Sequence, residues 1–313
     1  MTAKTLAIGN YNDTDAAALE HDLDAKRVSS LDEALALDDA AREAVTAIAY
    51  MGHAAFGGDA MDAFPNLGLI ANFGVGYDAI DVDAASARDI ALTNTPDVLN
   101  DDVADLAVAM LLMQGRRMRQ GDELVRSGRW ADGESFPLNR KMSGAKVGIL
   151  GLGRIGHDIA NRLAAFKMDL HYWSRSEKDT PGWTYHADPM DLARAVDVLV
   201  IALVGGPETE NMVNAAMLDA LGKDGVVINI SRGTTVDEGA LLDALEAGRI
   251  AGAGLDVFVG EPKVDPRFYK LDQVVLQPHQ GSGTVETRAA MGQLQRDNVA
   301  AFHEGKPLLT RVN

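Results

Sequence analysis

Short apolar runs alternate with amphipathic stretches along most of the chain. In the first third, apolar runs of strand length occupy residues 5–8, 46–51, 69–73 and 91–93. A second series occupies residues 146–150, 170–173, 198–203, 226–230, 254–258 and 274–277. Strands that alternate with helical patterns are typical of βαβ units and of parallel sheets. The pattern therefore predicts an α/β protein with two doubly wound parallel-sheet domains.

Turn signals place the boundaries between these domains. Residues 94–96 form a turn and helix-start signal before a long apolar stretch. Residues 285–303 predict a long helix, and the tail that follows it is too short to form a domain. We expect this helix to return to the first domain. That domain then comprises residues 1–99 plus 287–313, and the second comprises residues 100–286.

Composition and charge narrow the classes of function. The 313 residues are 47% hydrophobic and 24% charged, which is a globular composition and excludes intrinsic disorder. The formal charge of −17 repels nucleic-acid backbones and anionic lipids, so neither is expected as a partner. The absence of cysteine excludes disulfides, thiolate zinc sites and cysteine nucleophiles, and we predict no metal site. Because the apolar runs are far shorter than the roughly 20 residues of a membrane span, a cytoplasmic protein is expected.

A glycine-rich turn follows the apolar run 146–150. The segment Gly151-Leu152-Gly153-Arg154-Ile155-Gly156 leads from that predicted strand into a helical stretch. In this context the first glycine permits a tight turn, the second lets the backbone approach a pyrophosphate, and the third lets helix and strand pack closely. The helix start also presents free amides and a positive dipole end to phosphate. The segment therefore predicts a dinucleotide site, and a purely structural turn is the alternative.

The end of the next predicted strand indicates which dinucleotide binds. An NAD enzyme places Asp or Glu there to bind the ribose 2′-hydroxyl. This chain instead has Ser174-Arg175-Ser176, beginning 18 residues after Gly156. A guanidinium between two hydroxyls offers charge-assisted hydrogen bonds to a 2′-phosphate, which a carboxylate would repel. NADPH is therefore favoured over NADH, with a solvated arginine at a strand end as the alternative.

Three side chains with useful chemistry follow strands of the second series, namely Arg232, Glu261 and His279. Ligands of open α/β sheets bind at the carboxyl ends of strands, so we expect the three to meet beside a nicotinamide. An arginine grips a carboxylate and a keto oxygen, and an imidazolium near neutral pH donates a proton. A carboxylate hydrogen-bonded to that ring fixes it and favours its charged form. The set fits reduction of a 2-keto acid, although each residue alone has a structural alternative as a salt bridge, a surface turn or a core histidine.

Four motifs, in their order and spacing, resemble those of the D-isomer-specific 2-hydroxyacid dehydrogenase family: residues 151–156, Ser231-Arg232-Gly233, Glu261-Pro262 and Pro278-His279-Gln280-Gly281-Ser282. The resemblance spans essentially the whole chain. It implies a flavodoxin-like substrate domain and a Rossmann dinucleotide-binding domain.

The resemblance also implies roles for individual residues. Arg232, Glu261 and His279 match the family's catalytic residues, and Asp256 matches a residue that faces the nicotinamide carboxamide. In the first domain, the backbone amides of Val75 and Gly76 match the loop that binds the substrate carboxylate. Met51, at the end of a predicted strand, is expected beside the C3 substituent of the substrate.

Within the family, the chain is most similar to NADPH-dependent glyoxylate and hydroxypyruvate reductases, including the hydroxyphenylpyruvate branch. Residues 95–105, 174–176 and 281–288 carry this similarity. It implies reduction of a small 2-keto acid to the D-2-hydroxy acid, with an arylpyruvate as the alternative substrate. A dinucleotide-sensing corepressor-like protein is the non-enzymatic alternative, although no docking segment is visible. A phosphoglycerate dehydrogenase is disfavoured because no basic cluster serves a substrate phosphate, and a formate dehydrogenase would pair its histidine with glutamine in place of Glu261.

The segment 116–143 does not fit either series of strands. It is rich in Arg and Gly and carries Trp130 and Phe136 among polar residues. Exposed aromatic segments usually mark interfaces, and this one resembles the family's dimerisation region. We therefore expect a homodimer, with a local hydrophobic flap as the alternative.

Overall fold

The computed structural model describes residues 3–313, which divide into two compact units. The first unit comprises the chain up to Leu99 together with Thr284–Asn313, and the second unit comprises Asn100–Gly283. The chain re-enters the first unit at Thr284, because this residue caps the helix that starts at Val285. The division lies three residues before the boundary expected at residue 287.

The first unit is built on a parallel sheet. Among the described residues this sheet has five strands in the order β2-β1-β3-β4-β5, which is flavodoxin-like. Its strands are β1 (Thr5–Gly9), β2 (Lys26–Val28), β3 (Ala47–Met51), β4 (Leu69–Asn72) and β5 (Ala91–Thr93). Its helices are α1 (Asp13–Leu23), α2 (Leu31–Leu35), α3 (Asp39–Ala44), α4 (Gly58–Asp62), α5 (Val82–Ser86) and α12 (Val285–His303).

The second unit is also built on a parallel sheet. Its seven described strands run in the order β12-β11-β10-β9-β6-β7-β8, which is the Rossmann order with one added strand. The strands are β6 (Lys146–Leu150), β7 (Asp169–Trp173), β8 (Thr184–His186), β9 (Val198–Ile201), β10 (Val226–Asn229), β11 (Gly252–Leu255) and β12 (Val274–Leu276). The helices are α6 (Asn100–Gly115), α7 (Met118–Arg126), α8 (Arg154–Ala165), α9 (Pro189–Ala195), α10 (Ala215–Leu221) and α11 (Glu238–Glu246), with short 3₁₀ turns η1 (Pro207–Thr209), η2 (Gly233–Thr235) and η3 (Pro266–Lys270). The prediction of two doubly wound parallel-sheet domains is confirmed.

Burial explains which strands the apolar pattern predicted. Every residue of β4, β9 and β10 is buried, as expected for strands covered by helices on both faces. The pattern missed β2 and β8, which are three-residue edge strands without a buried residue. The strand expected at 254–258 is wrong in its second half, because β11 comprises Gly252–Leu255. A Cβ added at Gly252 or Gly254 would lie within 3.0 Å of Gln114 or Met110 of α6, so close helix packing requires glycines that carry no apolar signal.

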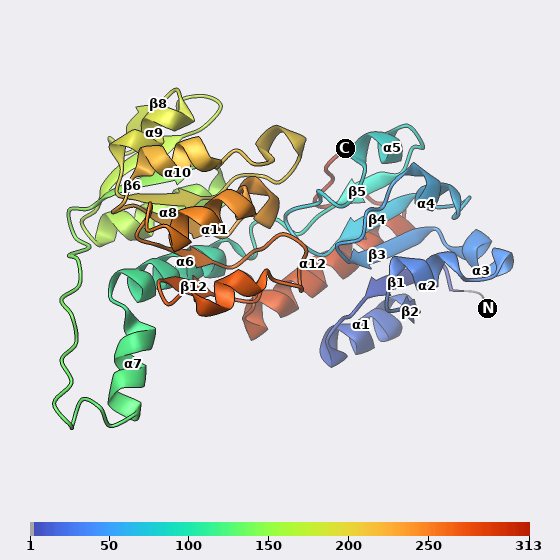
Figure 1. The fold of residues 1–313 in the computed structure, drawn as a ribbon. Coiled ribbons are helices and arrows are strands. Elements are labelled where there is room, and N and C mark those ends of the chain that lie inside the picture. Colours follow the sequence, from blue (N-terminus) through green and yellow to red (C-terminus); the bar gives the residue numbers. More distant parts are fainter. Residues whose placement is uncertain (1–2) are drawn as a thin grey trace. The chain divides into compact units, whose positions relative to one another are not determined.

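The C-terminal helix α12 packs against β3 and β4 of the first unit (Figure 1). The buried Arg296 of α12 forms a 3.3 Å ion pair with Asp15 of α1. Gln295 donates a 2.7 Å hydrogen bond to the carbonyl of Ala71 in β4. These long-range contacts hold the end of the chain in the first unit. In the described part of the chain, no helix is both long and apolar enough to cross a bilayer.

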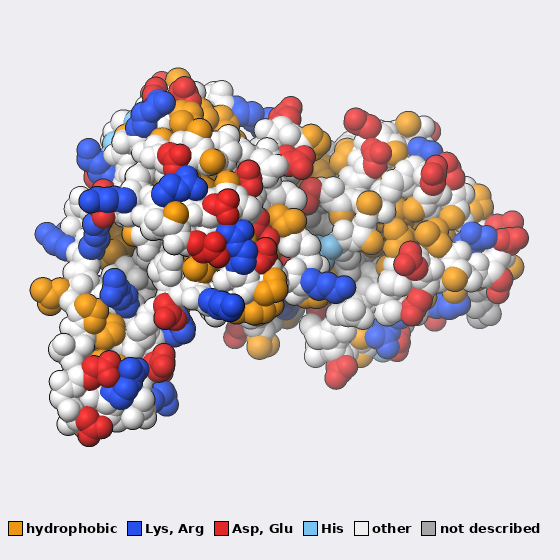
Figure 2. All heavy atoms as spheres, viewed as in Figure 1, with side chains coloured by type: hydrophobic (Ala, Val, Ile, Leu, Met, Phe, Trp, Pro, Cys, Tyr) orange, Lys and Arg blue, Asp and Glu red, His pale blue; other side chains and the backbone are white. Residues whose placement is uncertain are grey.

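The segment around α7 extends away from the sheet of the second unit (Figure 1). The space-filling view shows hydrophobic side chains exposed on it (Figure 2). Trp130 is 63% exposed and Leu138 is 99% exposed. The segment therefore leaves apolar surface without cover from its own unit.

Candidate active site

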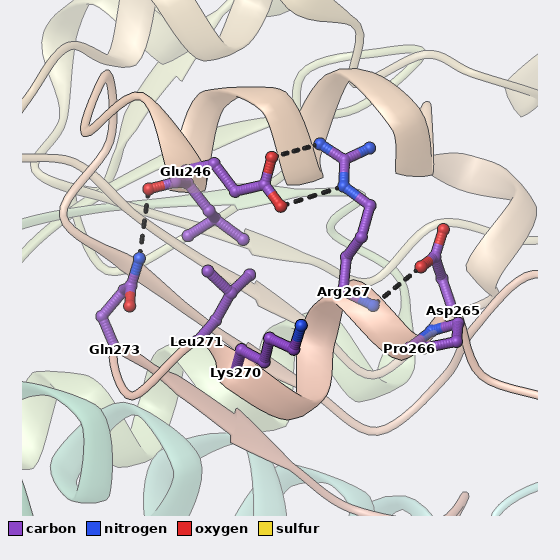
Figure 3. Close-up of a pocket in the computed structure, with 8 residues that line it drawn as sticks. Glu246, Asp265, Pro266, Arg267, Lys270, Leu271 and Gln273 are labelled. Atoms are coloured by element: carbon purple, nitrogen blue, oxygen red, sulfur yellow. Dashed lines mark hydrogen bonds and ion pairs between the residues drawn. The ribbon is translucent and has the colours of Figure 1, made fainter.

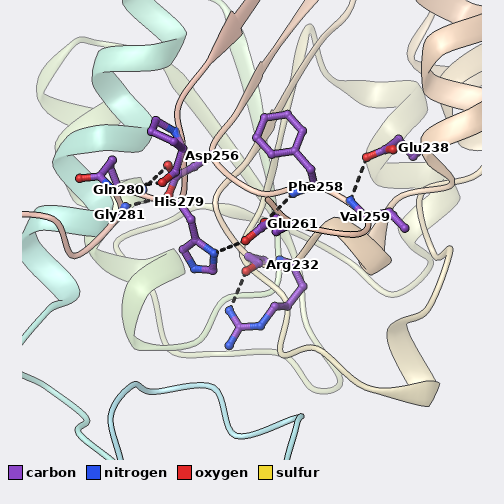
Figure 4. A network of polar contacts seen from close by, with 11 residues as sticks. Arg232, Glu238, Asp256, Phe258, Val259, Glu261, His279, Gln280 and Gly281 are labelled. Atoms are coloured by element: carbon purple, nitrogen blue, oxygen red, sulfur yellow. Dashed lines mark hydrogen bonds and ion pairs between the residues drawn. The ribbon is translucent and has the colours of Figure 1, made fainter. Parts of the chain in front are cut away.

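The strand order brings three predicted residues to neighbouring strand ends. The strands β10, β11 and β12 are adjacent and parallel, so their carboxyl ends lie at one edge of the sheet. Arg232 follows β10, Glu261 follows β11 and His279 follows β12. In Figure 4 the side chains of these residues lie close together.

His279 and Glu261 form a direct pair. The Nδ1 atom of His279 lies 2.7 Å from Oε2 of Glu261, and the two side chains are 35% and 24% exposed. The other oxygen of Glu261 accepts a 2.7 Å hydrogen bond from the backbone amide of Phe258, which fixes the carboxylate. Because Glu261 engages Nδ1, a proton donor role of this ring would use Nε2.

The turn that carries Arg232 is held by its own side chains. Asn229, at the end of β10, donates a 2.9 Å hydrogen bond to the carbonyl of Arg232 and accepts one from the amide of Ser231 at 3.0 Å. A Cβ added at Gly233 would lie 2.0 Å from the carbonyl carbon of Phe258. Glycine therefore lets the turn of Arg232 pack directly on the turn that leads to Glu261.

Sequence reasoning missed two supporting residues, Asn229 and Glu238. The Glu238 carboxylate accepts a 2.9 Å hydrogen bond from the amide of Val259, next to the amide that Glu261 binds. Burial raises the pKa of Glu238 above its ordinary value. No motif marks Glu238, since its relation to the site arises only when α11 packs near the end of β11.

Asp256, predicted to face the nicotinamide, is 1% exposed at the end of β11. Its carboxylate accepts hydrogen bonds from the backbone amides of Gln280 and Gly281, at 2.6 and 2.7 Å. Burial raises the pKa of Asp256, and these two amides act against that shift. Asp256 therefore contacts the loop that carries His279 (Figure 4).

The glycine fingerprint has the geometry that a dinucleotide requires. Gly151 has φ of +103°, and a Cβ there would lie 2.7 Å from the carbonyl oxygen of Ala202. A Cβ at Gly156 would lie 2.2 Å from the carbonyl oxygen of Gly151, whereas a Cβ at Gly153 would meet nothing within 4 Å. The start of α8, where Arg154 and Ile155 follow Gly153, is therefore open to a pyrophosphate.

The predicted 2′-phosphate turn follows β7. Ser174 is buried, and its hydroxyl donates a 2.5 Å hydrogen bond to the carbonyl of Ser176. Tyr185 of β8 donates a 3.4 Å hydrogen bond to the carbonyl of Ser174. Arg175 is exposed and makes no ion pair with any described residue. A fixed backbone thus presents an unneutralised guanidinium, which suits a cofactor phosphate.

The first unit contains the other predicted substrate residues. Met51 ends β3, and Val75 and Gly76 lie in the loop after β4. Asn72 donates hydrogen bonds to the carbonyls of Gly74 and Gly76, at 3.1 and 3.0 Å, and Asn94 donates one to the carbonyl of Val75 at 2.9 Å. The amides of Val75 and Gly76 have no acceptor among the described residues. The loop therefore turns its carbonyls inward and leaves two adjacent N–H groups for an anion.

A surface cavity of about 510 Å³ lies elsewhere in the second unit, between α11 and η3 (Figure 3). Its arginine, Arg267, forms a two-pronged contact with Glu246, at 3.0 and 2.7 Å, and a 2.6 Å contact with Asp243. Because these carboxylates already neutralise the guanidinium, the cavity offers no unpaired arginine to a ligand.

Comparisons with known proteins agree with this geometry. Residues 108–281 match the family described as D-isomer specific 2-hydroxyacid dehydrogenase, NAD binding domain. The chain is 47% identical to the hydroxyphenylpyruvate reductase of Plectranthus scutellarioides over 277 residues, 88% of each protein. It is also 47% identical to the 2-ketogluconate reductase of Gluconobacter oxydans over 252 residues, 80% of this chain and 81% of that protein.

A solved structure extends the likeness to the whole chain. The NADPH-dependent glyoxylate/hydroxypyruvate reductase of Sinorhizobium meliloti, in complex with NADP and malonate, superposes with a TM-score of 0.93 at 42% identity, covering 100% of this chain and 97% of that one. The protein therefore belongs to the D-isomer-specific 2-hydroxyacid dehydrogenase family of oxidoreductases.

Proposed function

We propose that the protein is an NADPH-dependent reductase that converts a small 2-keto acid, of the glyoxylate or hydroxypyruvate type, into the D-2-hydroxy acid. The observation that carries this proposal is the 2.7 Å contact between His279 and Glu261 at the same sheet edge as Arg232. The names of its relatives, which include glyoxylate/hydroxypyruvate reductases, support the choice of substrate.

In this proposal the residues of the second unit have separate roles in the reaction. NADPH, when bound along residues 151–156 and 174–176, supplies the hydride that reduces the keto carbon. The imidazolium of His279 gives its Nε2 proton to the keto oxygen, while the Glu261 carboxylate stabilises the positive ring before that transfer. The planar donors of Arg232 hold the carboxylate and the keto oxygen.

The first unit contributes to substrate binding. In this proposal the amides of Val75 and Gly76 bind the substrate carboxylate, and Met51 borders the C3 substituent. A loop whose carbonyls are held by Asn72 and Asn94 supports this role, because its N–H groups need no rearrangement to meet an anion.

One panel of substrates tests the function. Oxidation of NADPH and NADH is followed with glyoxylate, hydroxypyruvate, 4-hydroxyphenylpyruvate and 2-ketogluconate, and the configuration of each product is determined. We expect the highest kcat/KM with NADPH and glyoxylate or hydroxypyruvate. A preference for 4-hydroxyphenylpyruvate would favour the second candidate, an arylpyruvate reductase, which the relative from Plectranthus supports. Turnover of none of the four acids would contradict both.

The cofactor preference is tested at Arg175. One charge-assisted hydrogen bond contributes about 1.5 to 3 kcal/mol, which is about ten- to a hundredfold in affinity. Arg175→Ala is therefore expected to raise the KM for NADPH by about that factor and to leave the KM for NADH unchanged. Arg194→Ala is the matched control, because Arg194 is an exposed arginine of the same unit that pairs with Asp191. If Arg175→Ala raised the KM for NADPH and the KM for NADH equally, Arg175 would not determine the preference for NADPH.

We also propose that the chain forms a homodimer through the exposed segment 116–143. The exposed apolar side chains of that segment support this: Met118, Val125, Trp130, Phe136 and Leu138. Light scattering is expected to give about twice the chain mass of 33.3 kDa, and a monomer at micromolar concentration would contradict it.

A further inference from the structure

We propose that Asp256 is a positioning residue that sets the backbone of His279, the proposed proton donor. This inference rests on the proposed function for its catalytic consequence, while the positioning itself stands on the geometry of the second unit alone.

Asp256 binds three consecutive backbone amides. Its carbonyl accepts a hydrogen bond from the amide of His279 at 2.9 Å. Its Oδ1 atom accepts from Gln280 at 2.6 Å, and Oδ2 accepts from Gly281 at 2.7 Å. A single residue at the end of β11 thus holds the whole turn that follows β12 (Figure 4).

The turn needs such support because its backbone is unfavourable. His279 has φ of +53°, in the left-handed region that residues with a Cβ rarely adopt. The conformation persists only where neighbouring groups fix it, and the three amide contacts to Asp256 do so. They also determine where the imidazole meets Glu261, since the side chain leaves from this backbone.

Burial of the Asp256 carboxylate also costs free energy. Asp256 is 1% exposed, and burial disfavours its charged form. The two backbone amides and the nearby His279 compensate for that burial, while Glu261 opposes it. Both oxygens of the buried Asp256 carboxylate bind the turn of His279. This arrangement is better explained by positioning of the turn than by a contact to the nicotinamide alone.

The contact between the turn and the carboxylate is sterically tight. A Cβ added at Gly281 would lie 3.1 Å from Oδ2 of Asp256 and 3.3 Å from Cγ2 of Val103. The substitution Gly281→Ala therefore disturbs the contact between Gly281 and Asp256 but keeps the carboxylate. It provides a second, milder variant.

The test uses the full-length protein and two kinds of measurement. Asp256→Asn keeps one acceptor but turns an NH₂ group toward a backbone amide, so one of the two contacts is lost. For this variant and Gly281→Ala we would measure kcat with hydroxypyruvate, the Kd of NADPH, and the ring signals of ¹⁵N-labelled histidine, with His279→Gln assigning the signal of His279. Asp197→Asn is the control, because Asp197 also accepts a backbone hydrogen bond, from Lys146 at 2.8 Å, at the opposite end of the strands.

We expect Asp256→Asn to lower kcat at least tenfold, to change the Kd of NADPH less than twofold and to shift the His279 signal. Gly281→Ala is expected to shift the His279 signal by a smaller amount. If Asp256→Asn does not fold, the His279 signal of Gly281→Ala tests the positioning. An unchanged His279 signal in the folded variants would overturn the proposal, and an unchanged signal with tenfold weaker NADPH binding would assign Asp256 to the nicotinamide. If wild-type protein reduces no keto acid, the proposed function fails, yet the His279 signal still tests the positioning.

Discussion

The two units differ in how they present the groups proposed to bind ligands, although both use loops at the carboxyl ends of parallel strands. After β4, the first unit offers the backbone amides of Val75 and Gly76, with the carbonyls of the loop held by Asn72 and Asn94. After β10, β11 and β12, the second unit offers the side chains of Arg232, Glu261 and His279. Backbone groups bind an anion of fixed shape, whereas titratable side chains also move a proton.

This difference predicts different responses to mutation. In the second unit the atoms proposed to act belong to side chains, so we expect turnover to depend on the identity of those residues. In the first unit the atoms proposed to act belong to the backbone, so we expect Val75 to tolerate replacement and the residues that hold the loop not to tolerate it.

The largest effect is expected at the pair in the second unit. Glu261→Gln removes the charge that stabilises the imidazolium, and we expect kcat for keto-acid reduction to fall, by less than the roughly 10²- to 10⁴-fold expected when the general acid itself is lost. Glu238→Gln is the matched control, since Glu238 binds the adjacent amide of Val259. We expect this control to keep kcat within about threefold, and equal losses in the two variants would show that only the turn matters.

A smaller effect of another kind is expected in the first unit. Asn72→Ala releases the carbonyls of Gly74 and Gly76, and loss of two hydrogen bonds of about 1 kcal/mol each is expected to raise the KM for the keto acid about tenfold or more. The kcat is expected to change little, because binding is lost equally in ground state and transition state. Asn66→Ala is the control, since Asn66 also binds a backbone carbonyl, that of Glu43. A fall in kcat with an unchanged KM would contradict the division of roles.

The smallest effect concerns stability in acid, to which His186 of the second unit and His303 of the first unit contribute. Burial, and then the neighbouring His171, lowers the pKa of His186 in the second unit. Burial, and then Lys4, lowers the pKa of His303 in the first. The unfolded chain therefore takes up these protons first, and stability is lost as the pH falls below about 6.5.

Melting temperatures measured between pH 8 and pH 5 test this expectation. His186→Gln and His303→Gln should each flatten the decline, and a decline that neither variant changes would assign it to other groups.

The sequence predicted the elements and residues that local chemistry determines. Apolar runs marked the buried strands, and the fingerprint at 151–156 marked the start of α8. Arg232 and His279 stood directly after such runs, so their meeting at one sheet edge followed from the parallel topology.

The remaining features depend on contacts between distant segments. The edge strand β8 is short and partly exposed, so it carries no apolar signal. Glu238 reaches Val259 only through the packing of α11, and the amide contacts of Asp256 join positions 24 and 25 residues apart. Sequence spacing gives no indication of such contacts, so the sequence predicted the side chains of the candidate site but not the contacts that hold them.

The proposed role of His279 as the proton donor can be tested in a single turnover. Wild-type protein and His279→Ala are each mixed with NADPH and excess hydroxypyruvate, and the rate of NADPH oxidation is measured alongside the Kd of NADPH. If His279 donates the proton, the rate in His279→Ala is expected to fall by roughly 10² to 10⁴ while the Kd of NADPH changes less than threefold. A wild-type rate in His279→Ala would contradict it.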